Sequence, residues 1–308
     1  MASTLRSTRV IFQLPNKGTW FENIAVRPNG LLLVTRVDVP EVWAIDPASG
    51  GGTAIHSLPA PINSITGITE LSPDVYAIGA GQYDLAKGSI EGSWEIWTFS
   101  LASAERDARS MPRKVVDVPR AGLVNGLATL DAGTVLAADS THGSVYKIDL
   151  VSNTCSLALS DELMNPGPEP FIPIGINGIK IRDGFLYFTN SARALFCRLP
   201  IGAGAKATGE VEVLASGFVP DDLAFDTDGS ALIAAHPQNM VVKVLPGSSE
   251  VITVAGKVDS LEVAGGTACA FGRKDGEHRV LYVVTAGALS SPVNGETEPA
   301  KVVAIDLS

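Results

Sequence analysis

The sequence predicts an all-β protein, a six-bladed β-propeller with four antiparallel strands in each blade. Strand-like runs of Val, Ile, Leu and Phe fill the 308 residues, while helical periodicity is nearly absent. Residues typical of tight turns interrupt these runs at corresponding places. The pattern repeats every 40–60 residues or so, roughly the period of propeller blades.

Six units align along the chain. Each begins with a short strand, turns through residues that tolerate positive φ, such as Pro-Asn-Gly or Arg-Asp-Gly, and returns on a second strand. A third strand and a weaker fourth strand follow. The inner hairpins are expected at residues 21–35, 65–79, 124–139, 176–190, 220–235 and 266–285. The third strands are expected at residues 41–47, 94–101, 144–150, 194–200, 240–246 and 301–307.

The two ends of the chain predict how the ring closes. Residues 301–307 form a third strand with no fourth strand after them, and residues 9–15 form a strand without a partner. Pairing the two in the last blade would remove both exposed sheet edges. The units use nearly the whole chain, so we expect a single domain over residues 1–308; an open β-sandwich array is the alternative.

Composition excludes several classes of partner. The net charge is −10 and the sequence has no basic stripe, which disfavours nucleic acid. No apolar run reaches the roughly 18 residues of a membrane helix. The start lacks a secretory apolar stretch, and the three cysteines are widely spaced, so a cytoplasmic location is expected. The oligomeric state stays open.

One aligned column is polar in every unit. It lies where each inner strand begins, so its side chains should converge on the axis of a closed ring. Buried polar groups must be satisfied, here by ordered water or by a cation. The column consists of Glu22, Thr66, Asn125, Asn177, Asp221 and Thr267.

The column predicts a metal site. Two carboxylates and two amides, from Glu22, Asn125, Asn177 and Asp221, are hard oxygen donors that suit Ca²⁺, Mg²⁺ or Mn²⁺ and tolerate Zn²⁺. The simpler interpretation of Thr66 and Thr267 is that they line a water-filled channel.

Strand direction predicts the rest of the site. The second strands should end on the face where the inner strands begin, which places Asn190 and His236 there. Three long segments belong to the same face and fit walls or lids over a pocket: residues 79–93, 161–175 and 286–299. The residues expected at the rim are Trp20, Tyr83, Met164 and Phe171.

At these positions the sequence resembles the gluconolactonase/regucalcin family of six-bladed propellers. The resemblance covers all six units and implies a divalent metal held by Glu22, by Asn177 in an Asn-Gly, by Asp221 in a Pro-Asp, and by Asn125. The family's blade-three motif carries an Arg and an Asp that handle a sugar lactone. Residues 123–126, Leu-Val-Asn-Gly, lack both.

Other stretches look more like a fungal branch of this superfamily that is tied to secondary metabolism. They are ENIAVRPNG, GINGIKIRDGFLYFTNS and DDLAFD. That branch includes hetero-Diels–Alderases, which join tropolone quinone methides to a sesquiterpene. The resemblance implies a small-molecule, largely apolar substrate and a biosynthetic role.

Three functions follow as hypotheses. The first is a cyclase for an intermolecular hetero-Diels–Alder-type cycloaddition templated in the central channel, without an organic cofactor. Its expected catalytic side chains are Asp221, Glu22 and His236. Its expected substrate-binding side chains are Trp20, Thr66, Tyr83, Asn125, Asn190, Phe171 and Thr267.

The alternative is a divalent-metal-dependent lactone or ester hydrolase, in which the metal polarises the carbonyl and Asp221 ligates it or acts as base. The third hypothesis is a propeller that binds a protein partner without catalysis. The missing Arg and Asp favour the cyclase.

Overall fold

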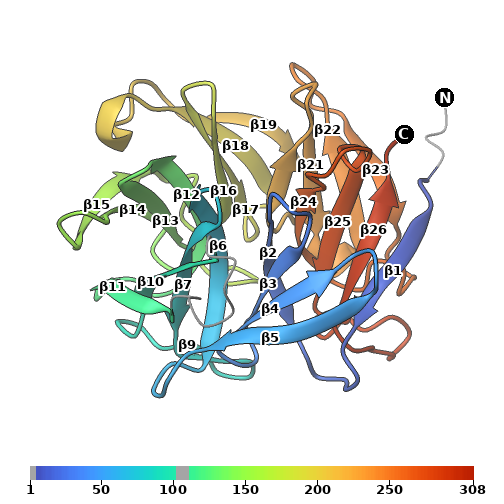
Figure 1. The fold of residues 1–308 in the computed structure, drawn as a ribbon. Helices are drawn as coiled ribbons and strands as arrows, with labels where there is room; N and C mark the ends of the chain where they lie inside the picture. Colours follow the sequence, from blue (N-terminus) through green and yellow to red (C-terminus); the bar gives the residue numbers. More distant parts are fainter. Residues whose placement is uncertain (1–4, 102–110) are drawn as a thin grey trace.

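The computed structural model describes residues 5–101 and 111–308 and contains six four-stranded antiparallel sheets around a common axis (Figure 1). The first three blades are β2 (Phe21–Val26), β3 (Leu32–Arg36), β4 (Glu41–Asp46) and β5 (Gly51–Ser57); β6 (Ser64–Ser72), β7 (Val75–Gly81), β10 (Glu95–Ser100) and β11 (Arg113–Asp117); and β12 (Val124–Asp131), β13 (Thr134–Asp139), β14 (Ser144–Asp149) and β15 (Thr154–Ser160).

The other three blades follow the same order. They are β16 (Ile176–Arg182), β17 (Phe185–Asn190), β18 (Leu195–Pro200) and β19 (Glu212–Ser216); β20 (Leu223–Phe225), β21 (Ala231–Ala235), β22 (Met240–Val244) and β23 (Val251–Gly256); and β24 (Gly266–Phe271), β25 (Val280–Thr285), β26 (Lys301–Asp306) and β1 (Thr8–Gln13). A small ribbon, β8 (Tyr83–Asp84) with β9 (Gly88–Ser89), and two 3₁₀ turns, η2 (Ala203–Ala205) and η3 (His236–Gln238), lie in connections. The predicted six-bladed propeller is confirmed.

The turn chemistry explains the inner hairpins. In the fourth blade Arg182 pairs with Phe185, so Asp183 and Gly184 form a two-residue loop. Their φ angles are 50° and 78°. Both central residues of a type I′ turn need positive φ, and Asp and Gly adopt it at low cost.

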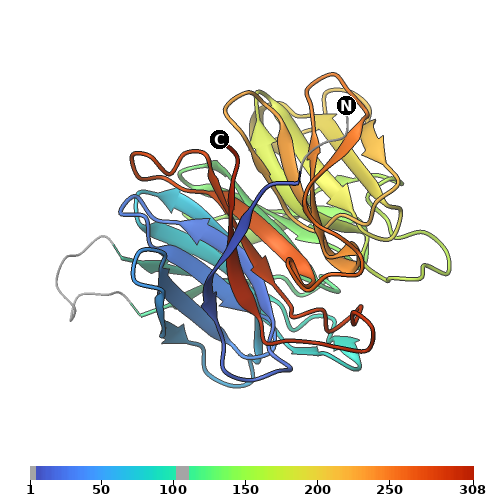
Figure 2. The same cartoon turned by 90° about the vertical axis from the view of Figure 1, so that its right-hand side faces the viewer.

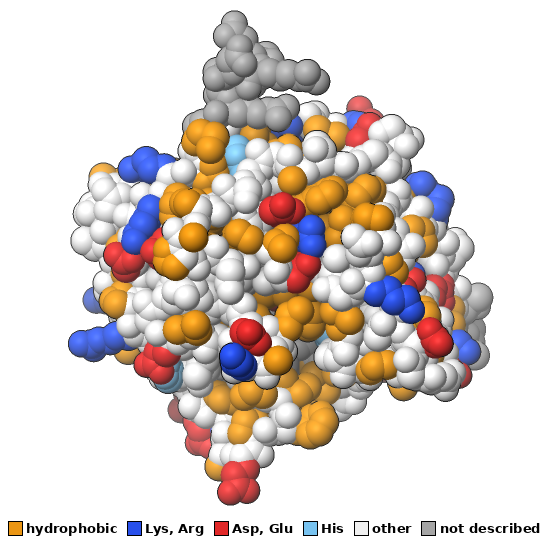
Figure 3. Space-filling model, turned by 90° about the horizontal axis from the view of Figure 1, so that it is seen from below, with side chains coloured by type: hydrophobic (Ala, Val, Ile, Leu, Met, Phe, Trp, Pro, Cys, Tyr) orange, Lys and Arg blue, Asp and Glu red, His pale blue; other side chains and the backbone are white. Residues whose placement is uncertain are grey.

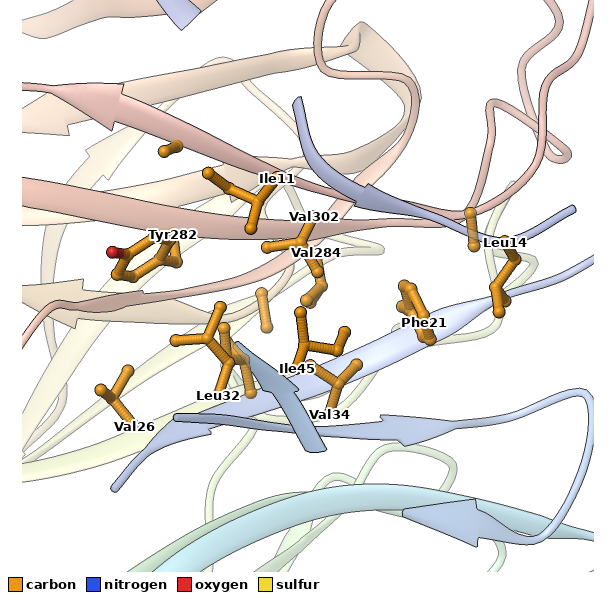
Figure 4. Packing of buried hydrophobic residues seen from close by; sticks show 14 residues of the cluster. Ile11, Leu14, Phe21, Val26, Leu32, Val34, Ile45, Tyr282, Val284 and Val302 are labelled. Atoms are coloured by element: carbon orange, nitrogen blue, oxygen red, sulfur yellow. The ribbon is translucent and has the colours of Figure 1, made fainter. Parts of the chain in front are cut away.

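The ring closes through the N-terminal strand, as predicted. β1 pairs antiparallel with β26, with Thr8 opposite Ile305 and Gln13 opposite Lys301. Figure 4 shows the core that this closure buries: Ile11 and Leu14 of the β1 region face Phe21 and Val302 of the first and last blades. The two ends of the ring therefore share one apolar cluster.

Within the described residues, hydroxyl groups on or just after the two inner strands join neighbouring blades at five of the six blade junctions. Each donates to a backbone carbonyl of the neighbouring blade, which satisfies carbonyls that the sheet ladders leave free near the axis. The bonds are Thr35 to Thr66 O (2.6 Å), Thr66 to Val124 O (2.7 Å), Ser140 to Ile176 O (2.6 Å), Ser191 to Pro220 O (2.6 Å) and Thr267 to Phe21 O (2.7 Å).

The three long segments lie on one face of the ring. In Figure 2, residues 79–93 (cyan), 161–175 (yellow-green) and 286–299 (dark red) all lie on the right-hand side, whereas the β24–β25 connection lies on the left. This face is the one at which the inner strands begin.

The surface shows no field of one sign on the side drawn in Figure 3, where Lys and Arg are interspersed with Asp and Glu. In the described residues no helix has the length and apolar character needed to cross a bilayer.

Candidate active site on the propeller axis

The carboxyl and amide members of the predicted column are buried at the starts of the inner strands. Glu22 is on β2, Asn125 on β12 and Asn177 on β16, and Asp221 lies two residues before β20. All four are less than a tenth exposed. The propeller thus holds these side chains on strands that surround the axis.

Glu22 is a buried carboxyl with a defined hydrogen-bond partner. Its Oε2 accepts a hydrogen bond from the indole Nε1–H of Trp20 at 2.5 Å. Burial raises the pKa of Glu22 to about 8, with the charge of Asp221 adding to the rise and the Trp20 hydrogen bond opposing it. Glu22 is therefore a neutral carboxylic acid at pH 7.

His236, at the start of η3, lies between Trp20, Asp221 and Ser290. Its ring stacks on the Trp20 indole with centroids 5.1 Å apart. Nδ1 is 3.2 Å from Asp221 Oδ2, at an angle that makes no hydrogen bond, and Nε2 is 2.5 Å from Ser290 Oγ. Burial lowers the pKa of His236 to about 4, so the imidazole is neutral at pH 7.

Asp221 is held from both sides. Its backbone carbonyl accepts a 2.5 Å hydrogen bond from the Thr189 hydroxyl, and Asn177 beside it donates to the Ser191 hydroxyl at 2.9 Å. Burial raises the pKa of Asp221 well above its usual range, and the neighbouring Asp222 raises it further. A hydrogen bond from Asn177 works in the opposite direction.

A second polar layer crosses the axis one position along the inner strands. Asn23 Nδ2 donates to Asp222 Oδ2 at 2.9 Å, and Lys180 Nζ lies 2.7 and 2.8 Å from the two Asp222 oxygens. These residues belong to the first, fifth and fourth blades, so side chains from opposite sides of the ring meet at the axis. The layer satisfies the hydrogen bonding of Asp222, whose charge still raises the pKa of Asp221.

Two other predicted residues remain available to a ligand. Tyr83 is half-buried, and burial followed by the charge of Glu22 raises its pKa, which places it near that carboxyl. Asn125 is buried, and within the described residues its side-chain amide makes no hydrogen bond. The polar atoms of this amide are not sealed from solvent, so water or a ligand can satisfy them.

The structure gives other tasks to several predicted site residues. Asn190 donates to the carbonyls of Leu163 and Asn165 and accepts from the Arg193 amide, so its hydrogen bonds fix the loop after β15 rather than a substrate. Thr66 and Thr267 bind backbone carbonyls of adjacent blades.

The two expected rim residues of the segment 161–175 also differ from expectation. Phe171 is fully exposed, and Met164 is fully buried in the core of the third and fourth blades. Phe171 therefore does not line a wall in this structure, and Met164 packs under the loop because its flexible thioether fills the apolar gap there.

Sequence reasoning missed Ser290, Asn23 and Lys180. It recognised Ser191 and Asp222 only as neighbours of Asn190 and Asp221. Ser290 lies inside the segment 286–299 that was expected to form a wall, but nothing local pairs it with His236. The second layer had a signal, since Asn23 and Asp222 each follow a column residue directly.

The side chains of the predicted metal site are not arranged as metal ligands in this structure. Across residues 5–101 and 111–308 no three His, Cys, Asp or Glu side chains are arranged to hold a metal ion. One oxygen of Glu22 accepts the Trp20 N–H, and Asp221 Oδ2 faces His236. The residues as placed do not form a ready-made cage of hard oxygens, so the divalent ion stays a prediction and the reaction proposed below uses none.

No family model matches the chain. The chain is 29% identical to a protein of Phoma sp that carries the name hetero-Diels–Alderase, covering 92% of this chain and 88% of that protein. It is 25% identical to a second protein of that name, asR5 of Sarocladium schorii, covering 90% and 77%. The predicted resemblance to proteins of this name is confirmed.

Solved structures share the fold at lower identity. A luciferin-regenerating enzyme matches with a TM-score of 0.70 at 16% identity, covering 98% of this chain and 95% of its own. Regucalcin from Agrobacterium tumefaciens, titled a calcium-binding protein, matches with 0.64 at 17% identity, covering 100% and 97%. A gluconolactonase-like structure matches with 0.63 at 14% identity, covering 99% and 93%.

Proposed function

We propose that this protein is a cyclase that joins two small, largely apolar molecules by a hetero-Diels–Alder cycloaddition at the axial site. The similarity to two proteins named hetero-Diels–Alderase, which spans about nine-tenths of this chain, supports the reaction class. The observation that carries the proposal is the buried Glu22 carboxyl, which the Trp20 indole N–H holds and whose pKa burial raises to about 8.

The reaction requires no covalent bond between the protein and either reactant. A conjugated carbonyl compound, C=C–C=O, supplies four π electrons and an alkene supplies two. Two σ bonds form, one C–C and one C–O, and the product is a dihydropyran that retains every atom of both reactants. The enzyme must hold the two in one orientation, and oriented reactions gain several kcal/mol from this alone.

A hydrogen-bond donor at the carbonyl oxygen accelerates the step. Negative charge grows on this oxygen if the alkene donates electron density, and a fixed donor in a water-poor site stabilises it. Glu22 in its neutral form carries such a proton. Trp20 holds one carboxyl oxygen, which leaves the other free to carry the O–H that faces the substrate.

The surroundings fit an aromatic, apolar reactant. The Trp20–His236 stack is a flat face beside the donor, and Tyr83 lies near the same carboxyl. Asn125 keeps a free amide for a second polar group of the substrate. The segments 79–93, 161–175 and 286–299 lie on this face of the ring (Figure 2). There they can shield a bound substrate from water.

The experiment is a cycloaddition assay. Purified protein is incubated with a carbonyl heterodiene and an apolar cyclic alkene, and the adduct is quantified by chiral chromatography with mass detection. The proposal expects faster formation of one stereoisomer than in buffer. It expects Glu22→Ala to lower kcat by about 10²- to 10³-fold, the effect of removing one donor to a developing charge.

A matched control tests whether the loss of rate is specific to the axial carboxyl. Glu262→Ala removes a carboxyl that contacts Thr8 away from the axis and should leave the rate unchanged. An adduct that forms at the buffer rate with a racemic outcome in the presence of wild-type protein would refute the proposal.

A further inference from the structure

Ser290, His236 and Asp221 lie next to one another in the order of a catalytic relay, with a close Ser290–His236 contact and a His236–Asp221 contact that is not hydrogen-bonded. Ser290 Oγ is 2.5 Å from His236 Nε2, and His236 Nδ1 is 3.2 Å from Asp221 Oδ2. The three residues come from three separate places in the chain: the connection after β25, η3, and the connection before β20. A nucleophilic triad is recognised by such geometry and not by sequence spacing.

From this geometry we infer that Ser290 is a nucleophile for the hydrolysis of small carboxylic esters, with His236 as its base and Asp221 as the residue that orients the base. This activity goes beyond the cycloaddition, because it needs a covalent intermediate and water. It also differs from metal-assisted hydrolysis, because the chain's own hydroxyl attacks the ester.

The exposure of the three residues fits these roles. Ser290 is exposed, so an ester can reach its hydroxyl, whereas His236 and Asp221 are buried behind it. Trp20 stacks on one side of the imidazole and limits its rotation. The base is therefore held in place while the nucleophile stays open to solvent.

The roles require one tautomer of the imidazole. Nδ1 carries the proton and lies 3.2 Å from Asp221 Oδ2 without a hydrogen bond in this structure, and Nε2 accepts the proton of the Ser290 hydroxyl. The Nδ1 contact is loose here, as such contacts often are before substrate binds.

The reaction balances with water as the second reactant. The Ser290 oxygen forms a bond to the ester carbonyl carbon as its proton passes to His236 Nε2. The ester C–O bond then breaks, and the leaving alkoxide takes the proton from Nε2, which leaves an acyl-serine. Water attacks the acyl carbon and gives its proton to Nε2, the bond to Oγ breaks, and Oγ recovers the proton. The net products are one acid and one alcohol.

A fluorophosphonate probe tests the nucleophile directly, because an activated serine displaces fluoride and forms a stable O–P bond. Wild-type protein is incubated with the probe and then analysed by intact mass and peptide mapping. We expect one adduct, on Ser290. Ser290→Ala should abolish it, and His236→Gln should slow it by about 10²-fold or more, the loss typical of a general base.

Ser291 provides the matched control, since it is the adjacent serine and its side chain makes no contact with His236. Ser291→Ala should label as fast as wild type and hydrolyse p-nitrophenyl butyrate as fast. Melting temperatures of all variants establish that they are folded. The inference is overturned if folded wild-type protein takes up no probe, or if Ser290→Ala labels like wild type.

Discussion

The Trp20 indole nitrogen lies 2.5 Å from Glu22 Oε2, and the same indole stacks on His236 at a centroid distance of 5.1 Å. One side chain of the first blade thus fixes an acid and covers an imidazole of the fifth blade. The arrangement places a neutral hydrogen-bond donor beside a flat aromatic face. Both features suit the binding of a conjugated carbonyl compound.

Trp20→Phe should shift the alkaline limb of the pH–rate profile to higher pH. The indole hydrogen bond opposes the rise in the pKa of Glu22, so its loss raises that pKa above about 8 and keeps the acid neutral to higher pH. Phenylalanine preserves an aromatic ring over His236. The pH dependence of kcat in the cycloaddition assay measures the shift, and an unmoved or lowered limb would contradict the assignment.

Glu22→Gln should stabilise the fold at alkaline pH. Folding raises the pKa of Glu22 from 4.5 to about 8, so the folded state binds more protons than the unfolded state across this window. The wild-type free energy of unfolding therefore falls as pH rises from 4.5 to 8, by on the order of a few kcal/mol. Glutamine cannot ionise and should not show this fall.

Urea denaturation of both proteins at pH 5 and pH 8.5 checks the point. The difference between the two free energies of unfolding should be small at pH 5 and favour the variant at pH 8.5. Equal differences at the two pH values would show that Glu22 titrates normally.

Chelation should leave the cycloaddition rate unchanged. The proposed donor is the carboxyl proton of Glu22, so dialysis against EDTA removes nothing that the step uses. Metal analysis before and after dialysis accompanies the rate measurement. A parallel loss of metal and rate, restored by Ca²⁺ or Mg²⁺, would instead favour the metal-dependent lactone or ester hydrolase.

Lys180→Met should destabilise the protein by about 2 kcal/mol, because it leaves the Asp222 charge without its partner. The cost is below that of a fully buried pair, since the Lys180 side chain is 30% exposed. Adding Asp222→Asn should recover part of the loss. A double-mutant cycle in urea measures the coupling, and additive effects would mean that the pair contributes nothing.

Ile11→Ala should cost about 2–5 kcal/mol, because Ile11 is buried between the first and last blades and closes the ring. Val10→Ala is the matched control on the same strand. Val10 is 51% exposed, so its change should stay within about 0.5 kcal/mol. Similar effects of the two changes would argue against closure through β1.

The sequence predicted the fold well because local chemistry specifies it. Turn residues such as Asp183 and Gly184 mark each inner hairpin. The first strand has no partner in the first blade and the last blade lacks a fourth strand, so the two are expected to pair. The column of polar residues at the beginnings of the inner strands was equally recognisable in the sequence. In the structure Glu22, Asn177 and Asp221 are buried at those positions. These features depend on short-range patterns repeated six times.

The contacts within the site could not be predicted in this way. Ser290 meets His236 across 54 positions of the chain, through loops whose path no periodicity describes. Thr66 and Thr267 look like channel lining in the sequence, yet their hydroxyls are used by carbonyls of adjacent blades. Asn190 and Phe171 were placed by strand direction alone, which gives the face of the ring but not where the side chain points.

The most direct test of the account is a crystal structure of the protein with the cycloadduct bound. The account predicts the adduct on the axis, against the Trp20 face, with its ring oxygen within hydrogen-bond distance of the Glu22 carboxyl. An adduct bound elsewhere, with Glu22 contacting only Trp20 and water, would contradict it.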